Sequence, residues 1–345
     1  MDNNTSGNNI LPQELENCNF VKTVLMLIVV FYHSILFWNG DWFTKNPAIE
    51  SKFLAYLSQW LNSFHIYAFT LVSGYIFYYL KFEKGKYNNF KQYAISKFKR
   101  LIVPYFCVSC IWIIPFNIFA FKNMETSQII EKFALGTSPS QLWFLLMLFN
   151  IFIIVYPLAT VFKNKVKTSV LIVVGIYLFG FIFSKYSLNY YQLRTSCRFL
   201  LFFFIGFQIR NLKLNLYRIP WYIYLIVNLL LYYTLIVLEP ENSICASIVR
   251  FVLQIEGSFA SFVILQQLAN YSYWDNKVFK FYSCSTMTIY LFHQQIICLT
   301  VLAFNGLVTP LLHGCLNFII AILISSVITY FLLKYNFTRF LVGEK

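Results

Sequence analysis

The sequence predicts an all-α fold: a polytopic integral membrane helix bundle of about ten transmembrane helices with both termini in the cytoplasm. Three observations support this prediction. The chain of 345 residues is 59% hydrophobic and only 12% charged, whereas soluble proteins carry about 25% charged residues. Apolar runs recur along the whole chain, and basic residues gather in the segments on one side of those runs. The aromatic content of 21% also suits a bundle with aromatic belts at both membrane surfaces.

The apolar runs are long enough, or nearly so, to cross a bilayer, because a spanning helix needs about 20 residues. They lie at residues 20–38, 53–80, 101–121, 142–162, 167–184, 195–210, 218–238, 247–270, 282–303 and 311–335. The sixth run is short and can be a partial span. No repeat or flexible linker divides the chain, so we expect a polar cytoplasmic segment at 1–19 and one transmembrane domain at 20–345.

The basic residues set the orientation. If residue 1 is cytoplasmic, most of the 27 lysines and arginines fall in cytoplasmic segments, as the positive-inside rule requires. The densest cluster is the stretch KFEKGKYNNFKQYAISKFKR at 81–100. Membrane topology therefore explains the net charge of +14, and we expect no nucleic-acid partner.

No metal site is expected. Cys107 and Cys110 have the C-x-x-C spacing, but a zinc or redox site would need a second pair or a nearby histidine. The two thiols lie in an apolar run, where cysteine behaves as a small hydrophobic residue.

Two residues of the first span do not belong in lipid. Lys22 and His33 lie eleven positions apart, which places them within about 20° on one helix face and about 16 Å apart along the axis. An ionisable side chain at membrane depth is expensive and by default marks a pathway or a site. Alternatively, Lys22 snorkels to the interface and His33 bonds a neighbouring helix.

A second group of cations precedes the third span. Lys97 and Arg100 are spaced i, i+3 on what we expect to be one helical turn. Pro104 removes the hydrogen bond to the Arg100 carbonyl, so a kink is predicted there. A cationic turn at the cytoplasmic mouth can hold a phosphorylated ligand, although it can also be a simple positive-inside anchor.

Four further polar residues inside or beside the spans are weaker candidates. His293 lies mid-span, and Glu256 is a carboxylate within a span that can orient an imidazole or guide protons. Alternatively, His293 is a packed histidine bonded across helices, and Glu256 is a partner of Arg250 or of a hydroxyl. His65 is expected to be a packing residue. Arg198, at an outer helix end, can contact an anionic acceptor or act as an anchor.

Short motifs then occur in a fixed order. They are Lys22-x10-His33; FTLVSGYIF with Ser73, Gly74 and Tyr75; SKFKRLIVPY with Lys97, Arg100 and Pro104; LWFL at Leu142–Leu145, including Trp143; FFFIG at Phe202–Gly206; and YLFH at Tyr290–His293. Each is weak alone, but together they extend over most of the chain. In these motifs the chain resembles the acyltransferase-3 family of membrane O-acyltransferases. Lysine stands at 22 and 97 where the family carries arginine, so the flat bidentate contact of arginine with phosphate is lost there.

The resemblance implies transfer of an acyl group, usually acetyl, from cytoplasmic acetyl-CoA to a hydroxyl of a cell-surface polysaccharide or lipid-linked sugar. Acetyl-CoA would be a donor substrate, with no cofactor bound permanently. The protein would be a multi-pass component of the bacterial plasma membrane, surrounded by lipid and of undetermined oligomeric state.

Within this interpretation each candidate has a chemical task. His33 would be the base that activates the acceptor, or would briefly carry the acyl group, because imidazole can take and return a proton near neutral pH. Lys22, Lys97 and Arg100 would hold the CoA phosphates. Two other classes remain open: a transporter or flippase of a glycan or lipid precursor, and a non-catalytic scaffold. We find no inverted repeat and no paired helices broken by glycine or proline in matching halves of the sequence, which argues against the transporter hypothesis.

Overall fold

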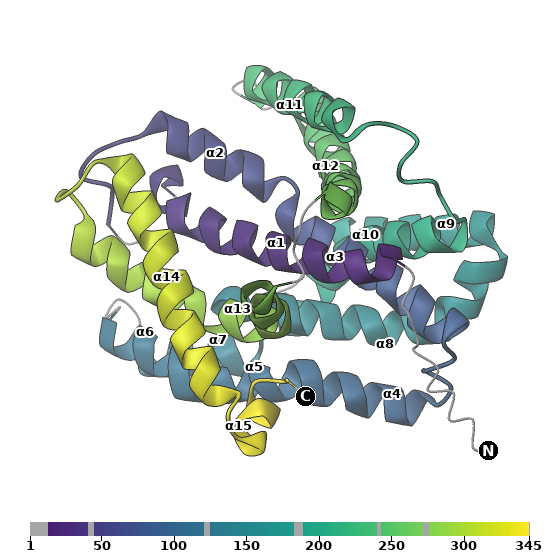
Figure 1. The fold of residues 1–345 in the computed structure, drawn as a ribbon, viewed down its shortest axis with the longest axis horizontal. Coiled ribbons are helices and arrows are strands. Elements are labelled where there is room, and N and C mark those ends of the chain that lie inside the picture. Colours follow the sequence, from purple (N-terminus) through teal and green to yellow (C-terminus); the bar gives the residue numbers. More distant parts are fainter. Residues whose placement is uncertain are drawn as a thin grey trace, which may run out of the picture.

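A computed structural model of the protein describes residues 13–40, 45–120, 125–182, 189–239, 243–271 and 276–344. Within these ranges every regular element is helical (Figure 1), which confirms the predicted all-helical class. Residues 1–12 of the expected polar N-terminal segment lie outside the described residues. The first helix already begins at Gln13, before the start of the first apolar run.

The elements follow one another along the chain with few long connections. In order they are α1 (Gln13–Ile35), η1 (Leu36–Asn39), α2 (Lys52–Asn62), α3 (His65–Tyr78), η2 (Tyr79–Glu83), α4 (Phe90–Lys97), η3 (Phe98–Ile102), α5 (Val103–Val108), η4 (Ser109–Ile113), α6 (Ile114–Ala120), α7 (Thr126–Ala134), η5 (Ser140–Leu142), α8 (Trp143–Asn164), α9 (Val166–Ile182), η7 (Tyr190–Gln192), α10 (Leu193–Asn211), α11 (Trp221–Leu238), α12 (Ile244–Tyr271), α13 (Lys277–Phe304), α14 (Pro310–Leu332) and α15 (Asn336–Leu341).

Within the described ranges, seven helices are long and apolar enough to cross a membrane. They are Asn17–Asn39, Phe90–Phe119, Ser140–Asn164, Trp221–Leu238, Ile244–Asn270, Lys277–Phe304 and Pro310–Leu332. Three other expected spans are not among them: the run 53–80 is interrupted, the helix in the run 167–184 has 17 residues, and the 19-residue helix over the run 195–210 carries Arg194, Arg198 and Arg210. The chain is therefore a helical protein with several long apolar helices, while the number of ten spans and the cytoplasmic position of both termini stay predictions.

Two expected spans have different bounds in the structure. The run 53–80 is divided, because α2 ends at Asn62 and α3 begins at His65. The run expected at 101–121 begins earlier, at Phe90, where the side chain of Asn89 accepts a hydrogen bond from the Gln92 N–H and caps the helix. Such a cap stabilises a helix start, and it places the second half of the basic cluster inside a helix.

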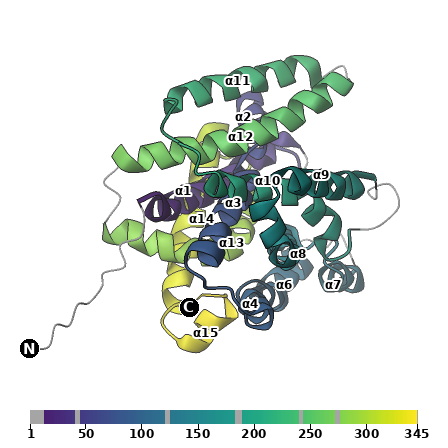
Figure 2. The same ribbon diagram turned by 90° about the vertical axis from the view of Figure 1, so that its right-hand side faces the viewer.

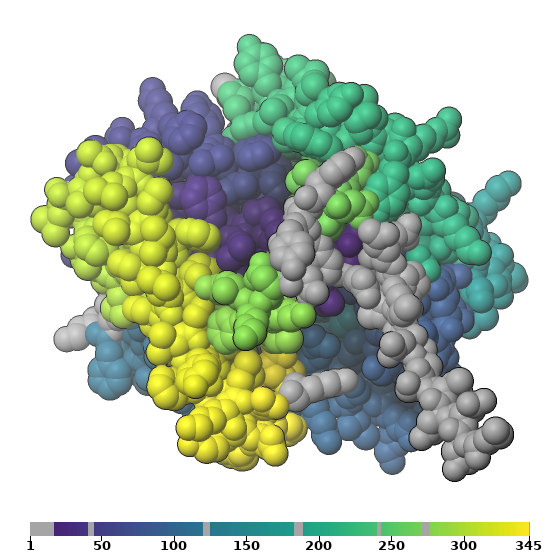
Figure 3. Space-filling view, viewed as in Figure 1, coloured from purple at the N-terminus to yellow at the C-terminus, as the bar shows by residue number. Residues whose placement is uncertain are grey.

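The helices form a layered bundle. α1 and α3 cross the middle of the molecule, with α8 and the α4–α6 run on one side and α2, α11 and α12 on the other (Figures 1 and 2). α13 packs against both α1 and α14. On the face shown in Figure 3, α14 and the residues that follow it lie beside α13. This arrangement brings α1, α3, α4, α8 and α13 around one common space.

The closest approach of two helices is between α3 and α10. A Cβ added at Gly74 would collide with the backbone carbonyl of Phe203, and one added at Gly206 would collide with that of Leu71. The contact is reciprocal, so each glycine makes room for the backbone of the other helix. Small residues at a crossing allow such close packing of membrane helices, which explains two of the sequence motifs in structural terms.

The predicted disturbance at Pro104 takes the form of a π-helical turn. The π turn η3 covers Phe98–Ile102 and leads directly into α5, where Pro104 lies in the first turn. Because proline has no N–H to donate to the Arg100 carbonyl, the hydrogen-bond pattern widens just before it. Single π turns of this kind often occur at functional sites. Arg100 lies within this turn.

Candidate active site

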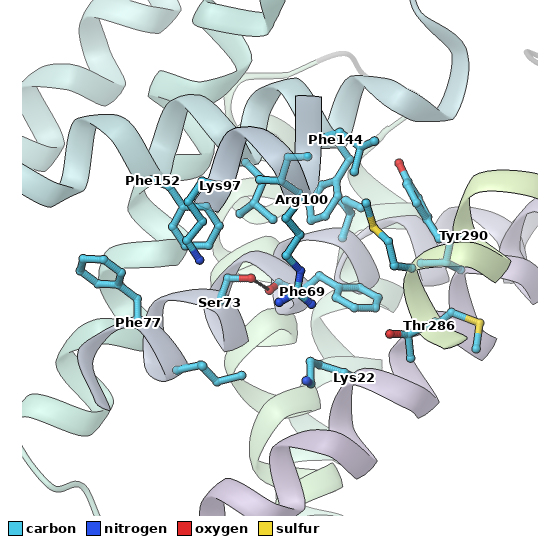
Figure 4. Close-up of a pocket in the computed structure, with 18 of the residues that line it drawn as sticks. Lys22, Phe69, Ser73, Phe77, Lys97, Arg100, Phe144, Phe152, Thr286 and Tyr290 are labelled. Carbon is cyan, nitrogen blue, oxygen red and sulfur yellow. Dashed lines mark hydrogen bonds between the residues drawn. The ribbon is translucent and has the colours of Figure 1, made fainter. Parts of the chain in front are cut away.

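A pocket of about 200 Å³ lies in the space enclosed by α1, α3, α4, η3, α8 and α13. One end is basic and most of the wall is apolar (Figure 4). The residues that line it are Lys22, Met26, Val29, Ile66, Phe69, Ser73, Ile76, Phe77, Leu80, Tyr87, Lys97, Arg100, Leu101, Phe144, Leu145, Leu148, Phe152, Thr286, Met287 and Tyr290. A pocket with a few polar groups in an apolar wall is typical of a small-molecule site.

The three predicted cations meet at the basic end. Lys97 is the last residue of α4 and Arg100 lies in η3, so both project from one helix. Lys22 reaches the same space from α1 on the opposite side (Figure 4). Three positive charges that converge on one pocket form a site for an anion with more than one charge, such as a phosphorylated ligand.

The Lys97 ammonium lies among aromatic rings. Its Nζ is 3.8 Å from the ring centroid of Phe152, 5.3 Å from that of Tyr87 and 5.4 Å from that of Tyr93. Cation–π attraction at such distances holds a positive charge over the ring faces. Three rings therefore surround the Lys97 ammonium, and Lys97 also lines the pocket.

Two histidines from distant parts of the chain are in contact. His293 Nε2 lies 3.3 Å from His33 Nδ1, and the ring centroids are 5.0 Å apart. The structure therefore pairs the two imidazoles that sequence reasoning considered separately. His293 is completely buried, and His33 is partly exposed.

Backbone carbonyl groups fix which nitrogen of each ring carries the proton. His33 Nδ1 lies 2.9 Å from the Val29 oxygen, and His293 Nδ1 lies 2.8 Å from the Tyr290 oxygen. A carbonyl oxygen only accepts hydrogen bonds, so each Nδ1 is the N–H donor in the neutral ring. The one Nδ1–H of His33 is therefore shared between the Val29 oxygen at 2.9 Å and His293 Nε2 at 3.3 Å, and the lone pair of His33 lies on Nε2.

The pocket and the histidine pair are joined through two residues. Neither His33 nor His293 is among the described residues that line the pocket, but Val29 and Tyr290 both are. These are the residues whose carbonyl groups hold the two imidazoles. The pair lies one helical turn beyond the pocket wall, and Val29 is about 10 Å further along α1 than Lys22.

A third histidine, which sequence reasoning assigned to packing, belongs to the same neighbourhood. The rings of His65 and Tyr32 have centroids 4.6 Å apart, and those of Tyr32 and His33 are 4.9 Å apart. His65 Nδ1 lies 2.7 Å from the Leu61 oxygen. Across the described ranges, no group of three or more histidine, cysteine or acidic residues could hold a metal ion.

Glu256 lies elsewhere. Its Oε2 accepts a hydrogen bond of 2.6 Å from Asn228 Nδ2, and Asn228 Oδ1 accepts one of 2.8 Å from Trp60 Nε1. The chain of bonds ties α12 to α11 and α2. The structure thus gives the carboxylate a structural partner that sequence reasoning did not identify; its pairing with Arg250 is wrong, because Arg250 instead bonds Glu239.

The residues of the Ser-Gly motif have separate environments. Ser73 lines the pocket and donates to the Phe69 oxygen at 3.0 Å. Gly74 allows the close contact of α3 with the backbone of α10. The Tyr75 hydroxyl accepts a hydrogen bond of 3.1 Å from Arg210, which also pairs with Glu83 at 2.8 Å. Only Ser73 of the three faces the pocket.

The last two predicted site residues lie outside the pocket. The ring of Trp143, at the start of α8, packs against Phe199 with centroids 5.6 Å apart. Arg198 is exposed on α10, close to Gly180 of α9. The contact of Arg198 with an anionic acceptor stays a prediction.

Sequence reasoning missed a cluster of amides next to the histidine pair. Gln141 Nε2 donates to the Leu291 oxygen at 3.0 Å and to Gln295 Oε1 at 2.7 Å, and the Tyr290 hydroxyl donates to the Gln141 backbone oxygen. These bonds tie the start of α8 to the turn of α13 that carries His293. Gln295 inside one apolar run and Gln141 directly before another were the signal that could have revealed them.

The comparisons agree with this architecture. The sequence model of the family Acyl_transf_3, described as an acyltransferase domain, matches residues 15–330. The fold and the site are those of a helical membrane protein with a buried pocket. The chain belongs to the acyltransferase-3 family, and it is therefore a membrane acyltransferase. No curated protein and no solved structure matched the chain.

Proposed function

We propose that the protein transfers an acyl group, acetyl in the simplest case, from acyl-CoA to a hydroxyl of a cell-surface polysaccharide or lipid-linked sugar. The donor would enter from the cytoplasm at the basic end of the pocket, and the protein would reside in a bacterial plasma membrane. Family membership supplies the reaction class. The donor, the acceptor and the direction are our proposal.

One observation carries the proposal. A single pocket has Lys22, Lys97 and Arg100 at one end, and its wall includes the two residues whose carbonyl groups hold the His33–His293 pair. Because CoA is a polyanion joined to a long uncharged arm, a basic mouth that leads into an apolar channel fits it. Charge-assisted contacts would hold the phosphates, and the thioester would lie near the pair.

The chemistry follows from the hydrogen bonds of the pair. His33 Nε2 takes the proton of the acceptor hydroxyl while its oxygen attacks the thioester carbonyl carbon. The new C–O bond forms, the C–S bond breaks, and the proton passes to the leaving CoA sulfur. The Val29 oxygen and His293 Nε2 share the His33 Nδ1–H, and both acceptors would support the positive charge that develops on that ring.

Acylation of His33 itself is a second chemical route to the same product. In that case the acyl group would pass from sulfur to His33 Nε2 and then to the hydroxyl oxygen. Brief incubation with labelled acetyl-CoA, followed by denaturation at neutral pH, separates the routes. Label that stays on the wild-type chain and is missing from His33→Gln indicates a covalent intermediate.

The proposed function is tested with membranes that contain the full chain and labelled acetyl-CoA. Wild-type membranes should transfer label to surface glycan, and mass spectrometry of glycans from a deletion strain should lack one acyl mark. Movement of glycan across the membrane without acyl exchange would contradict the proposal and favour a transporter. An acyl mark that persists in the deletion strain would also contradict it.

A further inference from the structure

The turn of α13 that carries His293 is fastened to the start of α8 by one side chain, that of Gln141. This residue lies in η5, the short turn that leads into α8, and it is only 3% exposed. Its Nε2 donates to the Leu291 oxygen at 3.0 Å and to Gln295 Oε1 at 2.7 Å. Gln295 Nε2 donates in return to Gln141 Oε1 at 3.1 Å. The two amides therefore form a reciprocal pair between distant segments of the chain.

The Gln141 amide uses its full hydrogen-bonding capacity. A glutamine amide offers two donor protons and two acceptor positions on its oxygen. Both protons are used on α13, and the oxygen accepts from Gln295 and from the Ser140 hydroxyl at 2.7 Å. The Ser140 hydroxyl proton is shared with Gln294 Oε1 at 3.3 Å. A buried polar network whose members are satisfied is rigid and specifies one arrangement.

The backbone is strained at this contact. Ser140 has a φ of +51°, in the left-handed region that residues with a side chain rarely adopt. Such a conformation persists only where the surrounding contacts enforce it, and in proteins it is concentrated at functional sites. The hydrogen bonds of Ser140 to the amides of Gln141 and Gln294 are contacts of this kind. The strained residue thus lies where η5 meets α13.

Gln141 contacts the side of α13 that lies behind the histidine pair. Leu291 and Gln295 are each two positions from His293, so they lie about 160° from it around the helix axis. His293 faces His33 on α1, while Gln141 binds the opposite side of the helix. α13 is therefore fixed between η5 and α1, and the bonds of Gln141 set how closely His293 approaches His33.

Tyr290 connects the same contact to the pocket. Its hydroxyl donates to the Gln141 backbone oxygen, and its carbonyl oxygen accepts from His293 Nδ1 at 2.8 Å. Tyr290 also lines the pocket (Figure 4). A residue anchored by Gln141 therefore borders the proposed donor site and holds the imidazole.

We propose that Gln141 is a positioning residue of the acyl transfer, which holds His293 at the distance and in the orientation that His33 requires. The inference rests on the proposed function, in which His33 is the base. Gln141 is not among the described residues that line the pocket, and it acts through α13. A displacement of about 1 Å can reduce a rate by about 10²-fold even when it starts far from the reacting atoms. Loss of Gln141 should therefore reduce kcat and leave donor binding unchanged.

The first test removes the amide and keeps the size of the side chain. In Gln141→Met, kcat should fall about tenfold through misorientation of the pair, while the donor KM and the dissociation constant of CoA stay at the wild-type values. Transfer from labelled acetyl-CoA by the full chain at equal membrane level measures kcat and KM, and calorimetric titration measures CoA binding.

A matched control removes another buried amide. Gln267 is 6% exposed and donates to the Leu216 and Ile219 oxygens at 2.7 and 2.8 Å. These bonds join α12 to the loop before α11 and involve neither α8 nor α13. Gln267→Met should therefore leave kcat unchanged. Thermal unfolding of both variants shows whether the fold is preserved.

A second test asks whether Gln141 acts through His293. In a chain that already carries His293→Asn, Gln141→Met should lower kcat by less than about twofold, because residues that act as a unit are not additive. An equal loss in both backgrounds would overturn the inference, since it would indicate a general structural role.

Tyr290→Phe is a milder variant that keeps the ring and the carbonyl group. It removes only the hydroxyl bond to the Gln141 backbone, so kcat should fall about two- to fivefold with an unchanged KM. This variant decides the question if Gln141→Met does not fold.

Further outcomes separate this inference from the proposed function. Wild-type kcat in folded Gln141→Met, or a raised KM with an unchanged kcat, would overturn this inference alone, because the wild type still transfers the acyl group. Wild-type kcat in Tyr290→Phe would have the same meaning. If the wild type transfers no acyl group from acetyl-CoA, the proposed function fails, and this inference fails with it.

Discussion

The two parts of the candidate site are built in different ways. At the basic end, three long side chains converge from α1, α4 and η3, and the ammonium of Lys97 lies over the ring of Phe152. At the histidine pair, each Nδ1 is fixed by a carbonyl group of its own helix at 2.8–2.9 Å. One part relies on charge and the other on geometry.

This difference predicts different tolerance to substitution. Charge attraction acts over several ångströms and is weakened by salt, so lysine can replace arginine at positions 22 and 97 without loss of attraction. Proton transfer requires atoms within hydrogen-bond distance. The basic end should therefore control donor affinity, and the histidine pair should control the rate of the chemical step.

The largest effect is expected at His33. In His33→Gln, acyl transfer should fall by about 10²- to 10⁴-fold, because a general base contributes that much. CoA affinity should not change. Labelled transfer at equal membrane level and calorimetric binding measure the two quantities. His65→Gln is the matched control and should lose much less activity; retained transfer in His33→Gln would remove the proposed base.

A smaller loss is expected at His293, which acts through His33. His293→Asn keeps a donor near the Tyr290 carbonyl, but its side chain is too short to place an acceptor at the position of Nε2, so kcat should fall by up to about 10²-fold through misorientation of His33. The KM for the donor should stay the same. His293→Gln, whose side-chain oxygen can replace Nε2, should recover part of the rate. A change in KM alone would instead indicate a packing residue.

At the basic end, the effect should be on affinity. Arg100→Gln should raise the donor KM about tenfold or more, because hydrogen bonds to charged groups are worth about 1.5–3 kcal/mol, while kcat stays close to the wild-type value. Arg100→Lys should retain most of the affinity, and added salt should raise the wild-type KM. The exposed Arg218→Gln is the control. A fall in kcat without a change in KM for Arg100→Gln would contradict the expectation that the basic end controls donor affinity and the histidine pair controls the rate.

The smallest effect is a dependence on pH. Burial raises the pKa of the Glu344 carboxyl, so it becomes protonated at a higher pH than an ordinary glutamate. Protonation removes a negative charge that interacts electrostatically with Arg100 and Lys22. The KM of the wild type should therefore approach that of Glu344→Gln as pH falls, and steady-state kinetics of both at several pH values measure the ratio. A ratio independent of pH would contradict this account.

Local sequence pattern predicted those features that depend on one segment. Apolar runs gave the helical class, and the i, i+3 spacing placed Lys97 and Arg100 on one helix. The break at Ser63 and Phe64 within the run 53–80 was missed, because apolar residues continue on both sides of it and hydropathy does not register a break between them.

Features that depend on contacts between distant segments were not predictable from pattern alone. His33 and His293 are separated by 260 positions, and helical periodicity defines faces without naming the helices that they meet. The same limit explains why Glu256 was considered as a partner of an imidazole, whereas its neighbour is Asn228. Gln141 was overlooked because a glutamine beside an apolar run resembles an interfacial residue.

The reciprocal glycine contact of α3 with α10 has a consequence for how the protein can open. Gly74 and Gly206 bring the two backbones together with no side chain between them, so neither helix can slide past the other without a steric collision. The crossing of α3 and α10 is therefore rigid, and α3 forms part of the pocket wall. In any rearrangement of the pocket walls, α3 and α10 should therefore move together as one unit.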